Sequence, residues 1–346
     1  MELADVNLRR VSRRSLLLAA SAGAGLAAAG TPASAAEATD DARPWPSLAG
    51  TEWVLRRRGQ RAAVVELGGG LREYTVDGVP FVDPYPLDSP VKSAGRVLAP
   101  WPNRLRDGLY TFGGVTQQLA ITDVPRRSAI HGFSRFVPWR PIRRSRDSIT
   151  LACVIAPQPG YPHPLRLTTH WSLTDDGLRA DHVAVNLGAT PAPFGLGTHP
   201  GLRVGDALID GLDLHLPALE RITVDDRLLP TGKVPVAGTP YDFTTPRPMG
   251  DLQLDTGFTG LVRGADGLTT TRLSAPNGPW VELWQEATFG WLQLFNGLGP
   301  SGRPRGTLAV EPMTCPADAF NSGEGVVVLQ PGARWAGSWG IRASTG

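Results

Sequence analysis

The chain has 346 residues, of which 34 are Lys or Arg and 32 are Asp or Glu, so its formal net charge is +2. This balance gives no electrostatic reason to expect nucleic acid or an anionic membrane as a partner, and it favours a small substrate of little charge. The two cysteines, Cys153 and Cys315, are too few for a disulfide framework or a thiolate zinc site, although one bridge between them stays open.

The first 35 residues have the pattern of a secretory leader. Arg13 and Arg14 precede an uncharged stretch rich in Ala and Gly at residues 15–36, which contains the small-residue sequence Ala33-Ser34-Ala35. The paired arginines favour twin-arginine export, so we expect an exported protein, secreted or held in the cell envelope. An uncleaved membrane anchor is the alternative, although the stretch is only weakly hydrophobic. Removing residues 1–35 takes away four Arg and two acidic residues, so the net charge falls from +2 to 0.

Short runs with strand character follow a loose tail predicted at residues 36–49. The chain holds 41 Gly and 32 Pro, which interrupt it too often for long helices. The predicted strands are residues 53–55, 62–67, 148–155, 165–173, 178–186, 212–216, 269–275, 280–284, 290–295 and 325–329. Many short strands without helical runs between them predict an all-β fold, a large antiparallel β-sandwich that forms one domain over residues 50–346.

Two of the six histidines lie in turns beside Gly or Pro, where a ligand can approach closely. His131 lies in Ala129-Ile-His-Gly-Phe and His199 in Gly195-Leu-Gly-Thr-His-Pro. The others are expected in structural roles, three in strand-like runs and one between two prolines: His170, His182, His215 and His163. The histidines lack the spacing of metal ligands, and no dinucleotide, phosphate-loop or nucleophile-elbow motif occurs, so we expect neither a metal nor a cofactor.

Glu311 is the acidic residue with the least ordinary surroundings. It follows the apolar run at residues 308–310 and precedes Pro312, so we expect it at the end of a strand. A carboxyl group in such apolar sequence needs a partner or a raised pKa. A salt bridge to a buried arginine is the structural alternative to a catalytic role.

Six motifs, in order along the chain, resemble the aldose 1-epimerase (galactose mutarotase) family, and a bacterial exported subgroup of it. They are Pro102-Asn-Arg-Leu-Arg-Asp-Gly, Ile130-His-Gly-Phe, Gly197-Thr-His-Pro, Thr239-Pro-Tyr-Asp-Phe, Leu254-Asp-Thr-Gly-Phe and Val310-Glu-Pro-Met-Thr-Cys-Pro, the last continuing to residue 332. The resemblance covers residues 50–343. It implies the mutarotase-like supersandwich and an isomerase that interconverts the α and β anomers of a free aldose, without a cofactor.

The same resemblance assigns roles to five residues. Glu311 matches the family's catalytic base and His199 its catalytic acid, which we expect as carboxylate and imidazolium. His131 and Arg104 match residues that contact the sugar near its ring oxygen and hydroxyls, and Asp255 matches a carboxylate that binds hydroxyls. An ion pair for Arg104 and a turn position for Asp255 are the structural alternatives. Of the tryptophans, three are considered for stacking on the sugar, although core packing is favoured: Trp101, Trp284 and Trp291.

Two departures from the galactose-type pattern leave the sugar open. Phe133 follows His131-Gly132 where a second glycine is expected, and Pro200 follows His199 where an aromatic residue often stands. A non-catalytic carbohydrate-binding protein on the same scaffold is one alternative, and glycoside hydrolysis or lyase action is another. A hexose-phosphate epimerase needs several cations at the site, whereas the arginines at 56–58 and 143–146 look like surface charge. The oligomeric state is also left open.

Overall fold

The computed structural model describes residues 47–88 and 93–346, so the predicted leader and most of the predicted tail lie outside the described residues. The described residues form one compact unit of antiparallel sheets. Within that part of the chain, no helix is long and apolar enough to cross a membrane. The expectation of an all-β fold with large antiparallel sheets is confirmed.

The larger sheet has twelve strands, and ten of them follow one another in the order β1-β2-β3-β4-β16-β25-β24-β21-β18-β19. The remaining two join at β25, which pairs with β15, and β15 pairs with β5. Its strands are β1 (Glu52–Arg57), β2 (Gln60–Val65), β3 (Leu71–Val76), β4 (Val79–Val82), β5 (Val97–Leu98), β15 (Gly197–Thr198), β16 (Gly201–Leu202), β18 (Ala218–Val224), β19 (Pro230–Pro235), β21 (Asp255–Leu261), β24 (Trp291–Phe295) and β25 (Leu308–Met313).

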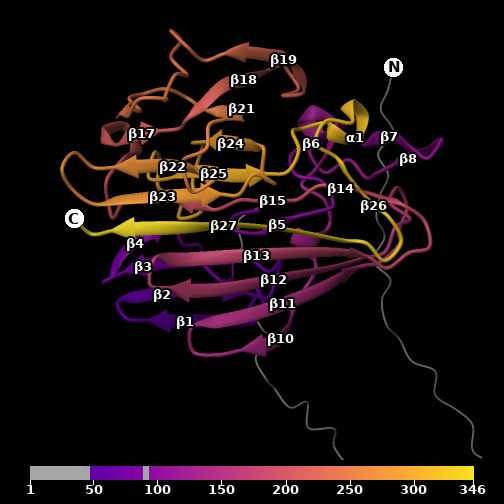
Figure 1. Ribbon diagram of the computed structural model, residues 1–346, viewed down its shortest axis with the longest axis horizontal. Coiled ribbons are helices and arrows are strands. Elements are labelled where there is room, and N and C mark those ends of the chain that lie inside the picture. The colour runs from indigo at the N-terminus through magenta and orange to yellow at the C-terminus, as the bar shows by residue number, and fades with distance from the viewer. Residues whose placement is uncertain (1–46, 89–92) are drawn as a thin grey trace, which may run out of the picture. The chain divides into compact units, whose positions relative to one another are not determined.

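The second sheet has nine strands in the order β10-β11-β12-β13-β27-β23-β22-β17-β20, and several of them run side by side across Figure 1. Its strands are β10 (Arg140–Arg144), β11 (Ser148–Ile155), β12 (Leu165–Thr174), β13 (Gly177–Asn186), β17 (Asp213–His215), β20 (Arg247–Pro248), β22 (Thr269–Ser274), β23 (Trp280–Gln285) and β27 (Arg334–Ser344). Three two-stranded ribbons are formed by β6 (Arg104–Arg106) with β9 (Ser128–Ile130), β7 (Leu109–Phe112) with β8 (Val115–Gln118), and β14 (Ala192–Phe194) with β26 (Val327–Leu329). The helical turns are η1 (Val124–Arg126), η2 (Ser134–Phe136), η3 (Ile209–Gly211) and α1 (Ala319–Ser322).

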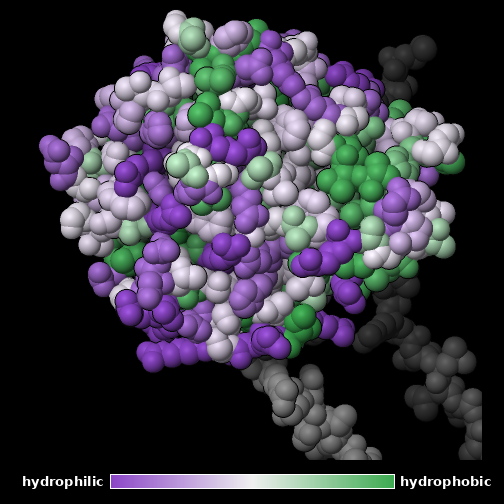
Figure 2. Space-filling view, viewed as in Figure 1, coloured by the Kyte–Doolittle hydropathy of each residue, from purple (hydrophilic) through white to green (hydrophobic). Residues whose placement is uncertain are grey.

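Alternation of side chains explains why strands such as β12 bury only one face. In β12, every second residue is buried and the residues between them are more exposed. Such a period of two places the buried set on a single face of the sheet. Hydrophilic side chains accordingly cover much of the surface in Figure 2. The indole N–H of Trp171 on β12 donates to the carbonyl of Gly69, between β2 and β3, so the two sheets meet across one continuous core.

The predicted strands agree best with the nine-stranded sheet. The prediction at 148–155 coincides with β11, and those at 165–173 and 178–186 end within one residue of β12 and β13. The sequence reading missed the exposed strand β19, which contains Pro, Gly and Lys. Propensity alone does not mark such a strand, since its hydrogen bonds to β18 hold it in the sheet.

The expectation that Glu311 ends a strand is wrong, because it lies inside the fully buried β25. The N–H of Val310 donates to the carbonyl of Pro200, so alternation turns the nitrogen of Pro312 toward the same side. On that side β15 and β16 are interrupted by the turn that carries His199. A missing proline N–H therefore costs no ladder hydrogen bond, and the strand continues.

Candidate functional site

All five residues assigned from the sequence line one cavity of about 560 Å³ on the twelve-stranded sheet. Its floor comes from β21, β24 and β25, and the ribbon of β6 and β9 with the turn η2 borders it. The lining residues are Ser93, Asn103, Arg104, Thr122, Asp123, Arg126, Ile130, His131, Arg135, Phe136, His199, Asp255, Gln293, Phe295 and Glu311. The volume is in the range of pockets that enclose a small molecule.

Glu311 and His199 are in direct contact in this cavity. The Nε2 atom of His199 lies 3.2 Å from Oε1 of Glu311, and the Glu311 side chain is 3 % exposed. The other carboxyl oxygen, Oε2, is buried and has no hydrogen-bond partner among the described residues. A salt bridge to a buried arginine, the structural alternative for Glu311, is not what the structure contains. A buried carboxyl oxygen without a partner is ready to accept a hydrogen bond from a ligand.

His131 is held in one tautomer by the backbone. The N–H of Asn103 donates to Nδ1 of His131 over 3.0 Å, so a neutral imidazole carries its proton on Nε2. His131 has a positive φ of 62°, which is uncommon for a residue with a side chain and is typical of functional positions. Its ring centre lies 5.7 Å from that of His199, so the two imidazoles face the same space.

A network of charged and amide groups lines the same cavity. Arg104 donates from Nε to Asp123 over 2.9 Å and reaches within 4.0 Å of Asp255. Gln293 donates from Nε2 to Oδ1 of Asp255 over 2.6 Å. Arg104 is therefore both a member of an ion pair and a lining residue. Asp255 is the first residue of β21, not a turn residue, and it keeps acceptor capacity for hydroxyl groups.

Burial sets the protonation of the Glu311–His199 pair in the empty cavity. Desolvation lowers the pKa of His199 to about 4, and it raises the pKa of Glu311 well above its usual value, with the charge of Asp255 adding to the rise. The pKa of His131 is lowered by burial and by the nearby charges of His199, Arg135 and Arg104. The expected carboxylate and imidazolium are thus not the favoured resting state, because two buried charges lose more hydration than one close contact returns.

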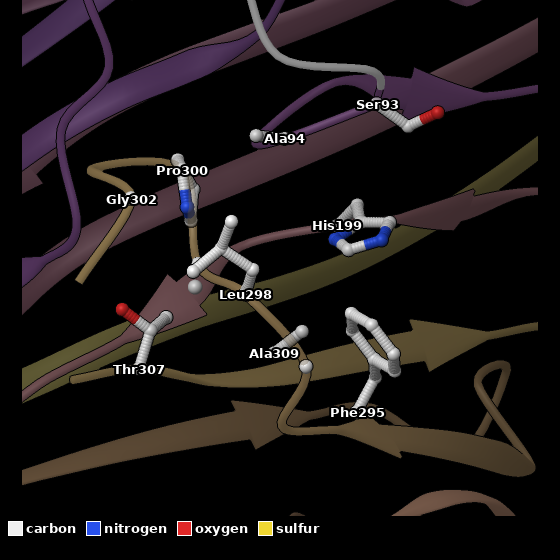
Figure 3. A pocket seen from close by; sticks show the side chains of 12 residues that line it. Ser93, Ala94, His199, Phe295, Leu298, Pro300, Gly302, Thr307 and Ala309 are labelled. Atoms are coloured by element: carbon white, nitrogen blue, oxygen red, sulfur yellow. The ribbon is translucent and has the colours of Figure 1, made fainter. Parts of the chain in front are cut away.

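A smaller, mostly apolar annex of about 270 Å³ adjoins the cavity (Figure 3). The two spaces share Ser93, His199 and Phe295. Leu298 and Pro300 line the annex but not the larger cavity. In Figure 3 the imidazole of His199 lies between Ser93 and Phe295, the other two residues that line both spaces. A ligand group bound at His199 therefore has further space in this annex.

Several lining residues were missed by the sequence reading. Gln293 lies in a predicted strand, but only the pairing of Gln293 with Glu311 across β24 and β25 brings it to the cavity. Phe136 and Phe295 are the aromatic lining residues, whereas the three tryptophans considered for stacking do not line it. Trp101, for example, packs against Phe133 with ring centres 5.0 Å apart.

The remaining histidines and the cysteines lie away from this chemistry. His182 is buried between Thr169 and Trp339, and the indole N–H donates to its Nε2 over 2.8 Å. His163 packs edge-on against Tyr161 and Phe112. Cys153 and Cys315 are both buried and free, so the structure contains no bridge between them.

One group of metal-ligating side chains occurs among the described residues. Single donor atoms of His131, His199 and Glu311 lie within 4.8 Å of one another. Two histidines and one carboxylate are a ligand set known for divalent transition metals. Nδ1 of His131 already accepts from a backbone N–H, which leaves its Nε2 as the available donor atom. The same three groups serve acid–base chemistry directly, so a chelation experiment distinguishes the two uses.

Comparison with known proteins places this chain in a family. The sequence profile of the family described as aldose 1-epimerase matches residues 52–342. The Escherichia coli K12 protein YihR is 32 % identical over 274 residues, which cover 78 % of this chain and 86 % of that protein. A maltose epimerase from Levilactobacillus brevis is 28 % identical over 227 residues, or 58 % of this chain and 64 % of that enzyme. The crystal structure of an aldose epimerase homologue from C. elegans, 19 % identical, superposes with a TM-score of 0.76 over 85 % of this chain and 99 % of that one.

Proposed function

The chain belongs to the aldose 1-epimerase family and is an isomerase acting on carbohydrates, and on this premise we propose that it interconverts the α and β anomers of a free aldose by opening and closing the sugar ring. The observation that carries the proposal is the contact between Glu311 and His199, 3.2 Å apart, at the wall of a cavity lined by hydrogen-bonding side chains. A protein that only binds sugar has no need of a buried acid–base pair.

The proposed reaction uses the pair at two oxygens of the sugar. Glu311 removes the proton from the hydroxyl on C1 while His199 donates a proton to the ring oxygen, and the bond between C1 and the ring oxygen breaks. Rotation about the bond between C1 and C2 presents the other face of the aldehyde. The two groups then exchange roles, and the ring closes to the opposite anomer with no net gain or loss of protons.

The resting pair contains the proton that this reaction needs. In the empty cavity, burial favours the form with the proton on the carboxyl group and a neutral imidazole. Its transfer from Glu311 to His199 gives the carboxylate and imidazolium without changing the total charge. Hydrogen bonds from sugar hydroxyls to the carboxylate favour the ionised form on binding, and one of them would give Oε2 the hydrogen-bond partner that it lacks.

The other lining groups orient the sugar. The guanidinium of Arg104 and the carboxylate of Asp255 offer donors and acceptors for adjacent hydroxyls, and Nε2–H of His131 donates near the ring oxygen. Phe295 offers an apolar face to the C–H side of the ring. The two departures from the galactose-type pattern, Phe133 and Pro200, do not line the cavity, and Phe133 packs against Trp101.

The test is anomer exchange followed by polarimetry or by NMR, starting from pure α-glucose and α-galactose. We expect the protein to accelerate mutarotation and the variant Glu311→Gln not to do so. Sugar binding by the wild type without faster exchange contradicts the proposal and favours a binding protein on this scaffold. Release of new products, in place of anomers, favours hydrolysis or lyase action.

We also propose that residues 1–35 direct export by the twin-arginine route and are removed. The support is the order of paired arginines, uncharged stretch and small-residue site in the sequence. Replacement of Arg13 and Arg14 by lysine should retain the protein in the cytoplasm, as followed by cell fractionation. An exported protein that keeps its full length and sediments with membranes favours the uncleaved anchor.

A further inference from the structure

Arg135 is a cation of the cavity without a carboxylate partner. It lines the cavity, is 6 % exposed, and forms none of the ion pairs found among the described residues. Its Nη1 donates to the hydroxyl of Ser93 over 2.8 Å and its Nη2 to the carbonyl of Ile130 over 3.1 Å, while the buried Nε has no partner. Both partners are neutral, so the guanidinium charge is not balanced locally.

A second buried arginine increases the excess of positive charge. Nη1 of Arg96 donates to the backbone carbonyl of Arg135 over 3.2 Å, and Arg96 is 3 % exposed. Arg96 also forms no ion pair among the described residues. Residues 89–92 have the sequence Ser-Pro-Val-Lys and therefore contain no acidic side chain. Two adjacent buried cations without an anion are costly unless a ligand supplies one.

The backbone fixes Arg135 in this position. It lies in η2, next to Ser134, which is fully buried. The Ser134 hydroxyl donates to the carbonyl of Val97 over 2.5 Å and accepts from the N–H of Ala99 over 2.8 Å. The site is thus built before any ligand arrives, as expected for a preorganised binding group.

The other two arginines of the cavity are paired with a carboxylate. Arg104 bonds to Asp123, and Arg126 lies within 3.7 Å of the same carboxylate. Arg135 instead lies beside the histidines, because its Nη2 donates to the carbonyl of Ile130, the residue before His131. Its Nη1 donates to Ser93, which lines both the cavity and the annex together with His199. The unpaired cation therefore lies on the side of His131 and His199, the groups that the proposed reaction places at the ring oxygen.

From this geometry we propose that the cavity binds an aldose whose exocyclic carbon, the one attached to C5, carries an oxyanion that pairs with Arg135. C1 and C5 flank the ring oxygen, so with Glu311 at C1 and His199 at the ring oxygen, the C5 substituent extends past His199. The planar guanidinium with unused N–H groups suits a carboxylate or a phosphate ester. The inference rests on the proposed function, because it uses the orientation of the sugar in that reaction.

An anion at Arg135 also assists the proposed acid. Positive charge from Arg135 opposes protonation of His199. A bound oxyanion offsets that charge, so the imidazolium forms more easily when the correct substrate is present. A neutral aldose leaves the charge in place and gains nothing from it.

The test compares D-glucuronate, D-glucose 6-phosphate and neutral D-glucose as substrates, with D-glucuronamide as the uncharged counterpart of glucuronate. We expect kcat/KM for one acidic sugar to exceed that for glucose and for the amide at least tenfold, after subtraction of the uncatalysed exchange. Preference for glucuronate identifies a carboxylate site, and preference for the phosphate identifies a phosphate site. Equal or better use of glucose overturns the inference.

The variant Arg135→Gln should lower the ratio of kcat/KM for the acidic sugar to that for glucose by roughly 10–100-fold. Arg135→Lys keeps the charge and should restore part of the preference, while Arg179→Gln on the other sheet controls for general loss of charge. Calorimetry of the acidic sugar binding to Glu311→Gln, with and without Arg135→Gln, gives a second measurement that does not depend on turnover. We expect the dissociation constant to be higher in the double variant. Anomer exchange without a preference for the acidic sugar contradicts only this inference. Sugar binding without anomer exchange contradicts the proposed reaction.

Discussion

Nε2 of His199 and Oε1 of Glu311 lie 3.2 Å apart, in a contact where burial disfavours charge on both side chains. A single proton shared by this pair produces either two neutral groups or a carboxylate and an imidazolium. The total charge of the cavity is the same in both forms. The pair is therefore able to accept a proton from one sugar oxygen and to deliver one to another, without exchange with solvent during the reaction.

Replacement of Glu311 by glutamine should remove the activity and preserve the fold. The amide keeps the size of the side chain but accepts no proton, so kcat/KM for anomer exchange should fall by about 10²–10⁴-fold. Because burial favours the uncharged form of this carboxyl group, the melting temperature should change little. Glu324→Gln, at the surface beside Lys233, is the matched control and should retain full activity. Activity within threefold of the wild type in Glu311→Gln would remove this residue from the mechanism.

The pH dependence should have its acid limb near pH 4 and not near 6.5. A lowered pKa means that His199 stays neutral as the pH falls, until it is protonated at about 4. Glu311, whose pKa is raised, is protonated in the same range, so the pair then holds two protons and has no base. Above about pH 4, the Glu311–His199 pair holds a single proton until Glu311 loses it at higher pH. Measurement of kcat/KM against pH checks this, and an acid limb centred on 6.5 would show that His199 is hydrated in the free enzyme.

The sequence indicated the reacting groups better than their arrangement. His199, His131 and Glu311 were recognised because each stands in a short motif of unusual local composition. Their meeting in one cavity depends on the interruption between β15 and β16 opposite Pro312, which is a property of the sheet. The local sequence around residue 311 therefore suggested a strand end, where the structure has an interior strand.

Residues that reach the site only because their strand pairs with another strand are harder to recognise from sequence. Gln293 occupies an ordinary strand position, and its neighbours across the sheet, Glu311 and Gly257, are distant along the chain. Arg135 gives no sign in the sequence that it is buried or unpaired. Long-range strand register decides such contacts, and local composition does not encode it. Periodicity within strands, by contrast, was enough for β11, β12 and β13.

Loss of the amide of Gln293 should weaken the binding of sugar more than the chemical step. Its Nε2 donates to Asp255 over 2.6 Å and fixes the carboxylate in the cavity. Gln293→Ala should lower kcat/KM by about 10–100-fold, mainly through KM, because a hydrogen bond to a charged group is removed. Gln330→Ala on the exposed surface is the control. A fall confined to kcat would assign Gln293 a role in the transition state and not in positioning Asp255.

Chelation should leave the activity unchanged if His131 acts as hydrogen-bond donor, His199 as acid and Glu311 as base. Prolonged treatment with EDTA, followed by gel filtration and metal analysis, gives the sample for the mutarotation assay. The three donor atoms lie close enough for a cation, so the experiment is decisive only with the metal content measured. Loss of activity that returns with one divalent metal would replace the acid–base proposal by a metal-assisted one.

Substitution of Gly132 tests whether the close approach of the backbone holds His131 in place. Gly132 has a positive φ of 60°, and a Cβ there would lie 2.1 Å from the carbonyl oxygen of Ala99. Gly132→Ala must therefore move the turn that carries His131, since neither backbone segment is able to yield cheaply. We expect a loss of more than about 2 kcal/mol in the free energy of unfolding, from strain and displacement together, and a raised KM.

Gly113 supplies the matched control for that substitution. Its φ of 58° is nearly the same, but a Cβ there would meet nothing within 4 Å. Gly113→Ala therefore carries the conformational cost alone, about 1–2 kcal/mol, and should leave KM unchanged. The difference between the two variants, measured by chemical denaturation and by the anomer-exchange assay, isolates the steric contact with Ala99. Equal destabilisation and equal KM in both variants would mean that the turn relaxes around the methyl group, and that the position of His131 does not depend on this contact.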